Sequence, residues 1–227
     1  MADQEKDTDL ASAIKAIADA VEEEEGPLTA KKRRIIEAAV VCFADQGYQA
    51  TSTSQIAKQA GVAEATIFRH FNTKKELLIR LVRPVTGRML VPAAIEELWG
   101  IKKETGSSFR GIAEAVMLSR VAFIDRYEPL FRIIAQELPF SPELRELLFT
   151  DSLQQGFGVL MGTLSELTAV GDIRADIPPA RLFRWFGSLL VGYVLLRSLL
   201  PPGTFDDKAE IAATVDFMIR GAGGDES

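Results

Sequence analysis

The stretch TSTSQIAKQAGVAEATIFRHFNTKKELL (Thr51–Leu78) predicts two very short helices joined by a tight turn. Ser52 and Gln55 have the spacing of a capping box, in which two side chains satisfy the free backbone amides at a helix start. Gly61 follows, and glycine adopts a positive φ more readily than any other residue. The second short helix is expected over roughly 63–71. A helix, a glycine turn and another helix are the pattern of a helix-turn-helix.

Longer helices are expected on both sides of this stretch. The first begins after Thr29 and ends at Gly47, and its apolar residues recur at helical spacing. Those residues are Ile36, Ala39, Val40 and Phe43. The second begins at a capping box of Thr73 and Glu76 and extends to about Leu98. The side chains expected to form a small core with the first of these helices are Ile56, Ala57, Ala60, Val62, Ile67 and Phe71.

Charge is distributed unevenly along the chain. The net charge is −6, but residues 27–75 carry +5, whereas residues 1–26 carry −7 and residues 76–227 carry −4. A compact basic block in an acidic protein indicates either a surface that meets phosphates or a solvated charged face. Four cations, Lys31–Arg34, lie in the first turns of the helix that starts after Thr29. They oppose the helix dipole there, so they cost stability unless an anion compensates them.

The order of these features resembles the DNA-binding domain of the TetR family of bacterial transcriptional regulators. The family pattern is a Thr or Ser pair, Ile-Ala, Ala-Gly-Val, a Thr-hydrophobic-aromatic triplet, a residue before Phe, and a Lys. The matching residues are Thr51–Ser52, Ile56–Ala57, Ala60–Gly61–Val62, Thr66–Ile67–Phe68, His70–Phe71 and Lys74. The preceding AAVVCFADQGY (Ala38–Tyr48) also resembles the family's first helix, whereas the rest of the chain matches only through length and helical content.

The resemblance implies an all-α protein with an N-terminal three-helix helix-turn-helix DNA-binding domain and a larger helical bundle for ligand binding and dimerisation. The residues agree, because strand signals are nearly absent. The expected parts are an acidic extension over 1–26, the DNA-binding domain over 27–75, the effector-binding and dimerisation domain over 76–221 and a flexible tail over 222–227. Further helices are expected over 107–126, 128–137, 142–169, 179–200 and 206–220.

The acidic extension is expected to form an amphipathic helix. Its apolar stripe consists of Leu10, Ile14, Ile17 and Val21. Because the extension lies next to the basic block in the chain, it either folds over that block or repels the phosphates of an operator. The alternative is a tail that only keeps the protein soluble.

The resemblance also indicates which residues contact DNA. A recognition helix inserts its N-terminal part into the major groove, which brings residues 63–66 near base edges. Arg69 is expected at a guanine, at a phosphate, or as a plain surface charge. Ser52 and Lys74 lie at helix N-termini, which attract phosphates, although capping alone would explain Ser52. The full set of predicted DNA contacts is Thr51, Ser52, Ser54, Ala63, Glu64, Ala65, Thr66, Phe68, Arg69, His70 and Lys74.

Two positions depart from the family pattern. The family commonly has a tyrosine where this chain has Phe68, and the tyrosine hydroxyl reaches a phosphate. Phe68 has no hydroxyl to offer. The family also commonly has a capping residue such as serine where this chain has Ala63, which cannot cap and costs roughly 1 kcal/mol of helix stability. The family's contacts therefore do not transfer directly to these two positions.

In the family, the last two long helices pair with their copies in a dimer. Apolar residues repeat at spacings of four and three over 182–200, as a helix-packing seam requires. A second apolar face, formed by Phe183, Leu190 and Val194, also needs burial. The predicted interface is Leu182, Phe186, Leu189, Tyr193, Leu196 and Leu200, with Ile211, Val215 and Met218 from the final helix. The alternative is a fully internal helix of a monomer.

Ligand pockets in such domains lie within the helical bundle, and large apolar side chains are the candidates for their lining. These are Trp99, Phe109, Met117, Phe123, Phe131, Phe157, Met161 and Trp185. Each of them is also explained as an ordinary core residue. Their character favours a hydrophobic or amphipathic effector.

Several function classes are excluded by what the sequence lacks. His70 is the only histidine and Cys42 the only cysteine, and no nucleotide-binding or hydrolase motif occurs. We therefore expect no enzyme activity, no metal and no cofactor. The start of the chain lacks a signal peptide, and the uncharged run between Arg184 and Arg197 is far shorter than the about 20 residues that span a bilayer. This predicts a cytoplasmic protein with no membrane partner.

The expected function is therefore that of a homodimeric repressor that binds double-stranded operator DNA and leaves it when a hydrophobic small molecule binds. Two alternatives within the family are an activator and a regulator controlled by a partner protein. An alternative of another class is a helical interaction module whose basic head docks an acidic protein or a membrane surface. The Gly61 turn followed by Thr66 to Lys74 argues against this module.

Overall fold

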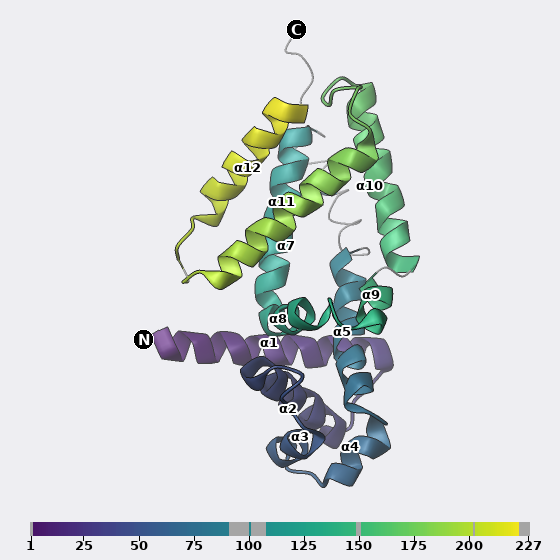
Figure 1. Cartoon of the computed structure of the whole chain (residues 1–227), viewed down its shortest axis with the longest axis vertical. Helices are drawn as coiled ribbons and strands as arrows, with labels where there is room; N and C mark the ends of the chain where they lie inside the picture. The colour runs from purple at the N-terminus through teal and green to yellow at the C-terminus, as the bar shows by residue number, and fades with distance from the viewer. Residues whose placement is uncertain (1, 91–99, 101–107, 149–150, 202, 223–227) are drawn as a thin grey trace. The chain divides into compact units, whose positions relative to one another are not determined.

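The computed structural model describes residues 2–90, 100, 108–148, 151–201 and 203–222. Within these ranges the backbone forms eleven α-helices and no strand, as the sequence predicts (Figure 1). The chain divides into two compact units. The head unit comprises Met1–Arg88 and Phe123–Thr150, and the bundle unit comprises Met89–Ala122 and Asp151–Ser227.

The head unit contains the predicted helix-turn-helix. Its helices are α1 (Ala2–Glu25), α2 (Ala30–Gln46), α3 (Thr53–Ala60), α4 (Glu64–His70), α5 (Lys74–Leu90), α8 (Glu128–Glu137) and α9 (Pro142–Leu148). Helices α2, α3 and α4 lie together, and α1 runs across α2 (Figure 1). The acidic extension is therefore a helix that packs on the head and not a free tail.

Helix boundaries in the head follow the capping residues that the sequence predicts. The Thr29 side chain accepts a hydrogen bond from an amide in the first turn of α2. Ser52 and Gln55 form both bonds of the capping box of α3. Gly61 ends α3 in the left-handed conformation, with φ of 64°. Ala63 makes no side-chain capping bond to α4, since its methyl group cannot accept one.

A single hydrophobic core holds the head unit together, and it includes the predicted small core. The buried members of that prediction are Ile36, Ala39, Val40, Phe43, Ile56, Ala57, Ala60, Ile67 and Phe71, while Val62 packs against them half-buried. Helix α1 joins the same core through Ile17 and Val21, which confirms the predicted amphipathic helix. Leu81 of α5 and Ile133 of α8 join it as well. The head unit is therefore larger than the predicted domain over 27–75.

The bundle unit is built from α7 (Phe109–Arg126) up to Ala122, α10 (Asp151–Ala169), α11 (Pro179–Leu199) and α12 (Asp207–Ala222). The expected helix over 142–169 is present as α9 and α10, one in each unit. Polar bonds tie α11 to α12. Asp207 accepts hydrogen bonds from the Tyr193 hydroxyl and from Arg197 Nε, the latter at 2.9 Å.

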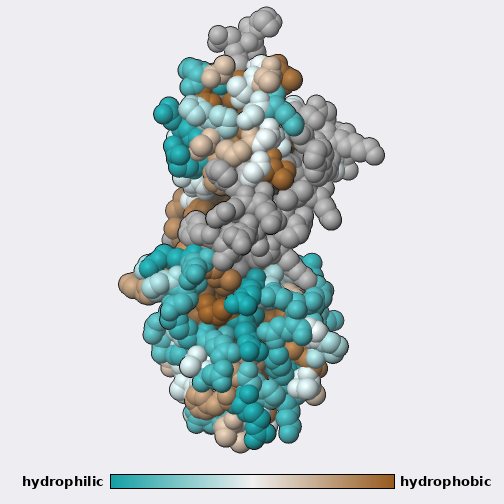
Figure 2. Space-filling model, turned by 90° about the vertical axis from the view of Figure 1, so that its right-hand side faces the viewer, coloured by the Kyte–Doolittle hydropathy of each residue, from teal (hydrophilic) through white to brown (hydrophobic). Residues whose placement is uncertain are grey.

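The surface of the head unit differs from its interior in polarity. Around α2 to α4, at the bottom of the view, the surface is mostly hydrophilic, and hydrophobic residues show only in small separate patches (Figure 2). No helix in the described part of the chain is long and apolar enough to cross a membrane. The large apolar side chains of α2 and α3 therefore pack in the core.

Candidate nucleic-acid interface

Helix α4, the predicted recognition helix, has one buried and one exposed face. Ile67 is fully buried, and Phe71 at the C-terminal cap is buried as well, which fixes the helix on the head core. The exposed positions are Ala63, Glu64, Ala65, Phe68 and Arg69, and the half-buried ones are Thr66 and His70. The residues predicted to contact DNA on this helix are therefore available on its outer side.

Glu64 connects the two short helices. The Thr53 hydroxyl, on the first residue of α3, donates a hydrogen bond to Glu64 Oε1 at 2.6 Å. This bond occupies a carboxylate oxygen that would otherwise be free to accept from a base. Sequence reasoning missed Thr53, because residues eleven positions apart on two different helices share no periodicity.

The start of α3 carries exposed serine side chains. The Ser52 hydroxyl accepts from the Gln55 amide at 3.2 Å, and Gln55 Oε1 accepts from the Ser52 amide at 2.7 Å. The Gln55 side-chain amide also donates to Gln46 Oε1 at the end of α2. Ser52 and Ser54 are both exposed at this helix start. Unpaired amides and the helix dipole make such a start attractive for a phosphate.

Two predicted DNA contacts, Thr51 and Lys74, have hydrogen-bond partners inside the protein. Thr51 is buried, and its hydroxyl donates to the carbonyls of Cys42 and Gly47 at 3.0 and 2.8 Å. Lys74 Nζ donates to the carbonyls of Tyr48 and Thr51, both at 2.8 Å, and lies 4.3 Å from the Tyr48 ring centroid. Burial lowers the Lys74 pKa. Both side chains therefore support the α2–α3 turn. Thr51 is buried, whereas Lys74 is half-buried, and its contact with a phosphate stays a prediction.

Helix α1 supplies the anions that the cations at the start of α2 require. Arg33 pairs with Asp19 and lies 3.5 Å from Glu22, and Lys32 pairs with Glu25. The hydrogen bond with Asp19 raises the Arg33 pKa. Lys31 and Arg34, in contrast, are exposed and form no ion pair within the described residues. Two of the four cations are therefore turned toward α1, and two are available to an outside anion.

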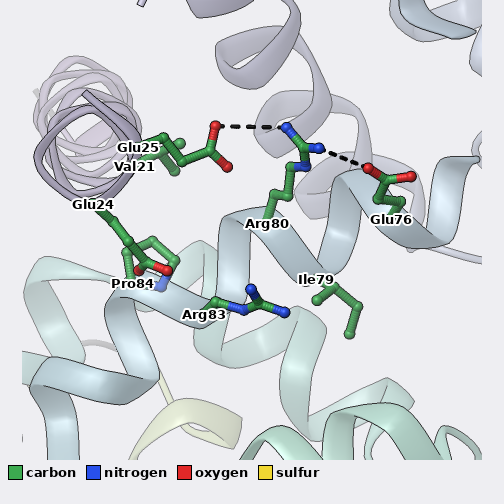
Figure 3. A pocket seen from close by; sticks show the side chains of 8 residues that line it. All are labelled: Val21, Glu24, Glu25, Glu76, Ile79, Arg80, Arg83 and Pro84. Atoms are coloured by element: carbon green, nitrogen blue, oxygen red, sulfur yellow. Dashed lines mark hydrogen bonds and ion pairs between the residues drawn. The ribbon is translucent and has the colours of Figure 1, made fainter. Parts of the chain in front are cut away.

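A polar hollow lies between the end of α1 and α5. It measures about 380 Å³ and is lined by Val21, Glu24, Glu25, Glu76, Ile79, Arg80, Arg83 and Pro84. Arg80 reaches across it, 3.6 Å from Glu25 on α1 and 2.8 Å from Glu76 on its own helix (Figure 3). Burial raises the pKa of Glu24 in its wall. The ion pairs across this hollow help to attach α1 to the head. Its polar lining also differs from that of the apolar pocket that the sequence predicts.

Polar contacts also tie the α2–α3 turn and α5 to α8 and α9. The Gln49 side-chain amide donates to Glu137 Oε2 at 2.6 Å, and Glu137 is buried. Lys75 pairs with Glu143 at the start of α9. This pairing, with the hydrogen bonds from Ser141 and the backbone, lowers the Glu143 pKa. The sequence carries no signal for these contacts, because their partners lie far apart in the chain.

The predicted dimer seam is partly an interior surface of the bundle unit. Leu182, Ile211, Val215 and Met218 are buried in the core of this unit, and Phe186, Leu189 and Tyr193 pack against that core half-buried. Leu196 and Leu200 alone of the predicted seam are exposed. The face of α11 that remains open instead carries Trp185, Val191, Leu195 and Leu196. The sequence analysis selected one apolar face of α11 as the dimer seam, but α11 is apolar on more than one face, so periodicity alone does not identify the face that the core buries.

The predicted pocket residues are divided between the two units. Phe109 and Met117 are buried in the bundle core, and Met161 packs against it. Phe123 and Phe131 pack against the head core, with ring centroids 6.2 Å apart, and Trp185 is exposed on α11. Trp99 and the side chain of Phe157 lie outside the described residues. Large size and apolar character alone did not distinguish pocket residues from core residues.

Comparison with known proteins identifies relatives of the head. The model of the family "Bacterial regulatory proteins, tetR family" matches residues 35–81, which covers α3, α4 and most of α2. The fatty acid metabolism regulator protein of Bacillus subtilis is 43% identical over 60 residues, 26% of this chain and 31% of the relative. That match spans less than a third of the relative.

Other relatives match over most of their length. The HTH-type transcriptional repressor AcnR of Corynebacterium diphtheriae is 32% identical over 195 residues, which are 85% of this chain and 93% of the relative. The crystal structure of the transcriptional regulator FadR from Bacillus subtilis in complex with stearoyl-CoA superposes with a TM-score of 0.60 and 22% identity. It covers 83% of this chain and 97% of that one, and shows that the two share a fold.

Proposed function

Because the chain belongs to the tetR family of bacterial regulatory proteins, we propose that it is a homodimeric transcriptional repressor that leaves its operator when a hydrophobic small molecule binds. The observation that carries the proposal is the exposed face of α4 on a helix-turn-helix, among exposed cations. The relative AcnR is a transcriptional repressor by name. Our proposal extends that activity to this chain.

In this proposal, α4 enters the major groove of the operator. Arg69 makes a contact to guanine or to a phosphate. Thr66 lies near base edges, and His70 faces the phosphate backbone. Ser52 and Ser54 meet a phosphate at the start of α3. The exposed cations Lys31 and Arg34 add sequence-independent attraction, because each neutralised phosphate releases a counterion.

The proposed dimer forms through the open face of the last two helices. Trp185, Val191, Leu195 and Leu196 expose apolar surface along α11, and Phe217 exposes 71% of its surface on α12. Exposed apolar patches of this kind mark protein interfaces. Two heads held by one interface reach two half-sites about one helical turn apart, as palindromic operators require.

The proposed effector is hydrophobic or amphipathic and binds in the bundle unit. Support comes from the apolar interior of that unit, which includes Phe109, Met117 and Met161. It also comes from the structural neighbour FadR, which was crystallised in complex with stearoyl-CoA. A long acyl chain is thus the first class of effector to try.

The test is a binding measurement with the DNA upstream of the protein's own gene, at a stated salt concentration. Fluorescence anisotropy should show specific binding with a Kd of about 10⁻⁸ to 10⁻¹¹ M, and stearoyl-CoA serves as the first effector probe. A promoter–reporter fusion should become more active when the gene is deleted. Lower reporter activity after deletion would indicate an activator, and binding no tighter than to unrelated DNA would contradict operator recognition.

A further inference from the structure

Phe68 is unusual among the large apolar side chains of the head unit. It lies on the outer face of α4 and exposes 45% of its surface. In the described part of the head unit, Phe140 on the α8–α9 turn is the other large apolar side chain that is exposed. The ring of Phe68 therefore costs free energy in the isolated protein, which a ligand that covers it would recover.

The surroundings of Phe68 combine apolar and cationic groups. Ala65 precedes it by three residues, so the two share one exposed face of the helix. Arg69 is exposed beside it. Arg34 reaches the adjoining turn, and its Nη1 atom lies 3.7 Å from the point where a Cβ atom would stand if Gly61 had a side chain. Glu64 is engaged by the Thr53 hydroxyl. An apolar strip bordered by cations fits the groove of duplex DNA better than an apolar protein partner.

The major groove offers one apolar group among its base edges, the C5 methyl group of thymine. A phenylalanine ring has no hydrogen-bonding group, so it gains free energy in the groove only by covering apolar surface. A tyrosine would carry a hydroxyl able to form a hydrogen bond, and Phe68 has none. We propose that Phe68 determines sequence specificity by packing against a thymine methyl group in each half-site of the operator. This assignment rests on the proposed function.

The experiment removes only the methyl group. A duplex selected from a random pool by the wild-type protein is remade with deoxyuridine in place of each thymine in turn, symmetrically in both half-sites. Binding is measured by fluorescence anisotropy. At one thymine position per half-site, the wild-type protein should bind about fourfold more weakly for each methyl group removed. The Phe68→Ala variant should bind all these duplexes more weakly and show no response at that position.

Two matched variants complete the test. Phe68→Tyr keeps the ring and should keep the response to the methyl group. Phe140→Ala removes the other exposed ring of the head and should leave both affinity and response unchanged. Circular dichroism and thermal unfolding should be the same for Phe68→Ala as for the wild type, since the ring is not part of the buried core.

The outcomes that overturn the assignment are distinct from those that overturn the proposed function. If no substitution by deoxyuridine weakens wild-type binding, or if Phe68→Ala keeps the full methyl response, the contact is wrong while operator binding stands. Equal weakening of Phe68→Ala on all duplexes, with no methyl response in the wild type, would indicate a contact to the sugar and also overturn the assignment. If the pool yields no enriched sequence, both the proposed function and the assignment fail.

Discussion

The head unit and the bundle unit expose different kinds of surface. In the described part of the head, Phe68 and Phe140 are the large apolar side chains left in solvent. The bundle exposes many more, which are Leu118, Val170, Trp185, Val191, Leu195, Leu196, Leu200 and Phe217. The head exposes cations at the start of α2 and on α4, among them Lys31, Arg34 and Arg69, whereas the exposed cations of the bundle, such as Arg181 and Arg184, lie beside these apolar side chains. The chain thus has one surface suited to phosphates and a second surface suited to a protein partner. Substitutions in these two surfaces should therefore impair the protein in different ways.

The largest effect is expected in the head core. Phe71 is fully buried at the end of α4, and Phe71→Ala should lower the free energy of unfolding by about 3–5 kcal/mol, because it removes apolar contacts and leaves a cavity. The matched control is Phe140→Ala, which removes an 80% exposed ring. Denaturant unfolding followed by circular dichroism measures both. Similar losses for the two variants would contradict the core described for the head.

The next largest effect concerns the open face of α11. Val191 exposes 67% of its surface, so Val191→Glu should leave the monomer folded. It would bury a carboxylate in the proposed dimer, at a cost of several kcal/mol, and should weaken operator binding by about a hundredfold or more. Sedimentation velocity should show monomers.

Leu182→Glu is the contrasting variant on the same helix. Leu182 is buried in the core of its own unit, so this change should unfold the bundle instead of separating two folded chains. A dimer that persists in Val191→Glu would refute the proposed interface.

This contrast also shows what a sequence alone can decide. Caps are local, so Ser52 and Gln55 predict the start of α3, and the φ of Gly61 follows from the turn that it must make. On α2 and α3, one face is apolar and periodicity orients the helix. On α11 the apolar residues surround the helix, and only the packing of the other helices determines that Leu182 points inward and Val191 outward.

The residues of the candidate site also divide into those whose exposure follows from helical periodicity and those whose contacts depend on other elements. The exposed positions of α4 follow from its period, so most of the predicted contacts on that helix are available. Thr51 and Lys74 match the family pattern equally well, but their hydrogen bonds run to backbone carbonyls of α2 and of the α2–α3 turn. A sequence motif shows that a residue type is required at a position, but it does not show which neighbouring group that residue contacts. Helical periodicity likewise does not predict the ion pairs of Arg33 with α1, because these pairs join different helices.

A moderate effect is expected for the cation on the recognition helix. Arg69→Ala should weaken operator binding by about 1–3 kcal/mol if its guanidinium contacts a base, and it should relax the preference at that base pair. Helicity and dimerisation should not change, because Arg69 is exposed. The control is Arg132→Ala, which removes an exposed arginine that pairs with Glu128 on α8. If Arg69→Ala lowers affinity for every duplex equally, the side chain contacts a phosphate instead of a base.

The smallest effect is expected for the acidic helix α1. Asp19 and Glu22 hold Arg33 against α1, so Asp19→Asn or Glu22→Gln should free that cation for a phosphate. Deleting α1 would confuse this test, because Ile17 and Val21 belong to the head core. Partly exposed ion pairs contribute little to stability, about 0–1 kcal/mol, so the substituted proteins should remain folded.

The measurement is affinity for operator and for unrelated duplex across a salt series. The charge-matched control is Glu146→Gln, at an exposed position of α9. Freeing one cation should steepen the dependence of log K on log salt by about 0.9 and tighten binding to both duplexes at low salt. Glu146→Gln changes the net charge equally but frees no cation near α4, so its slope should stay at the wild-type value. If all three variants give the same curves, α1 acts on the head through its packing alone, and the pairing of Arg33 with Asp19 has no electrostatic role in DNA binding.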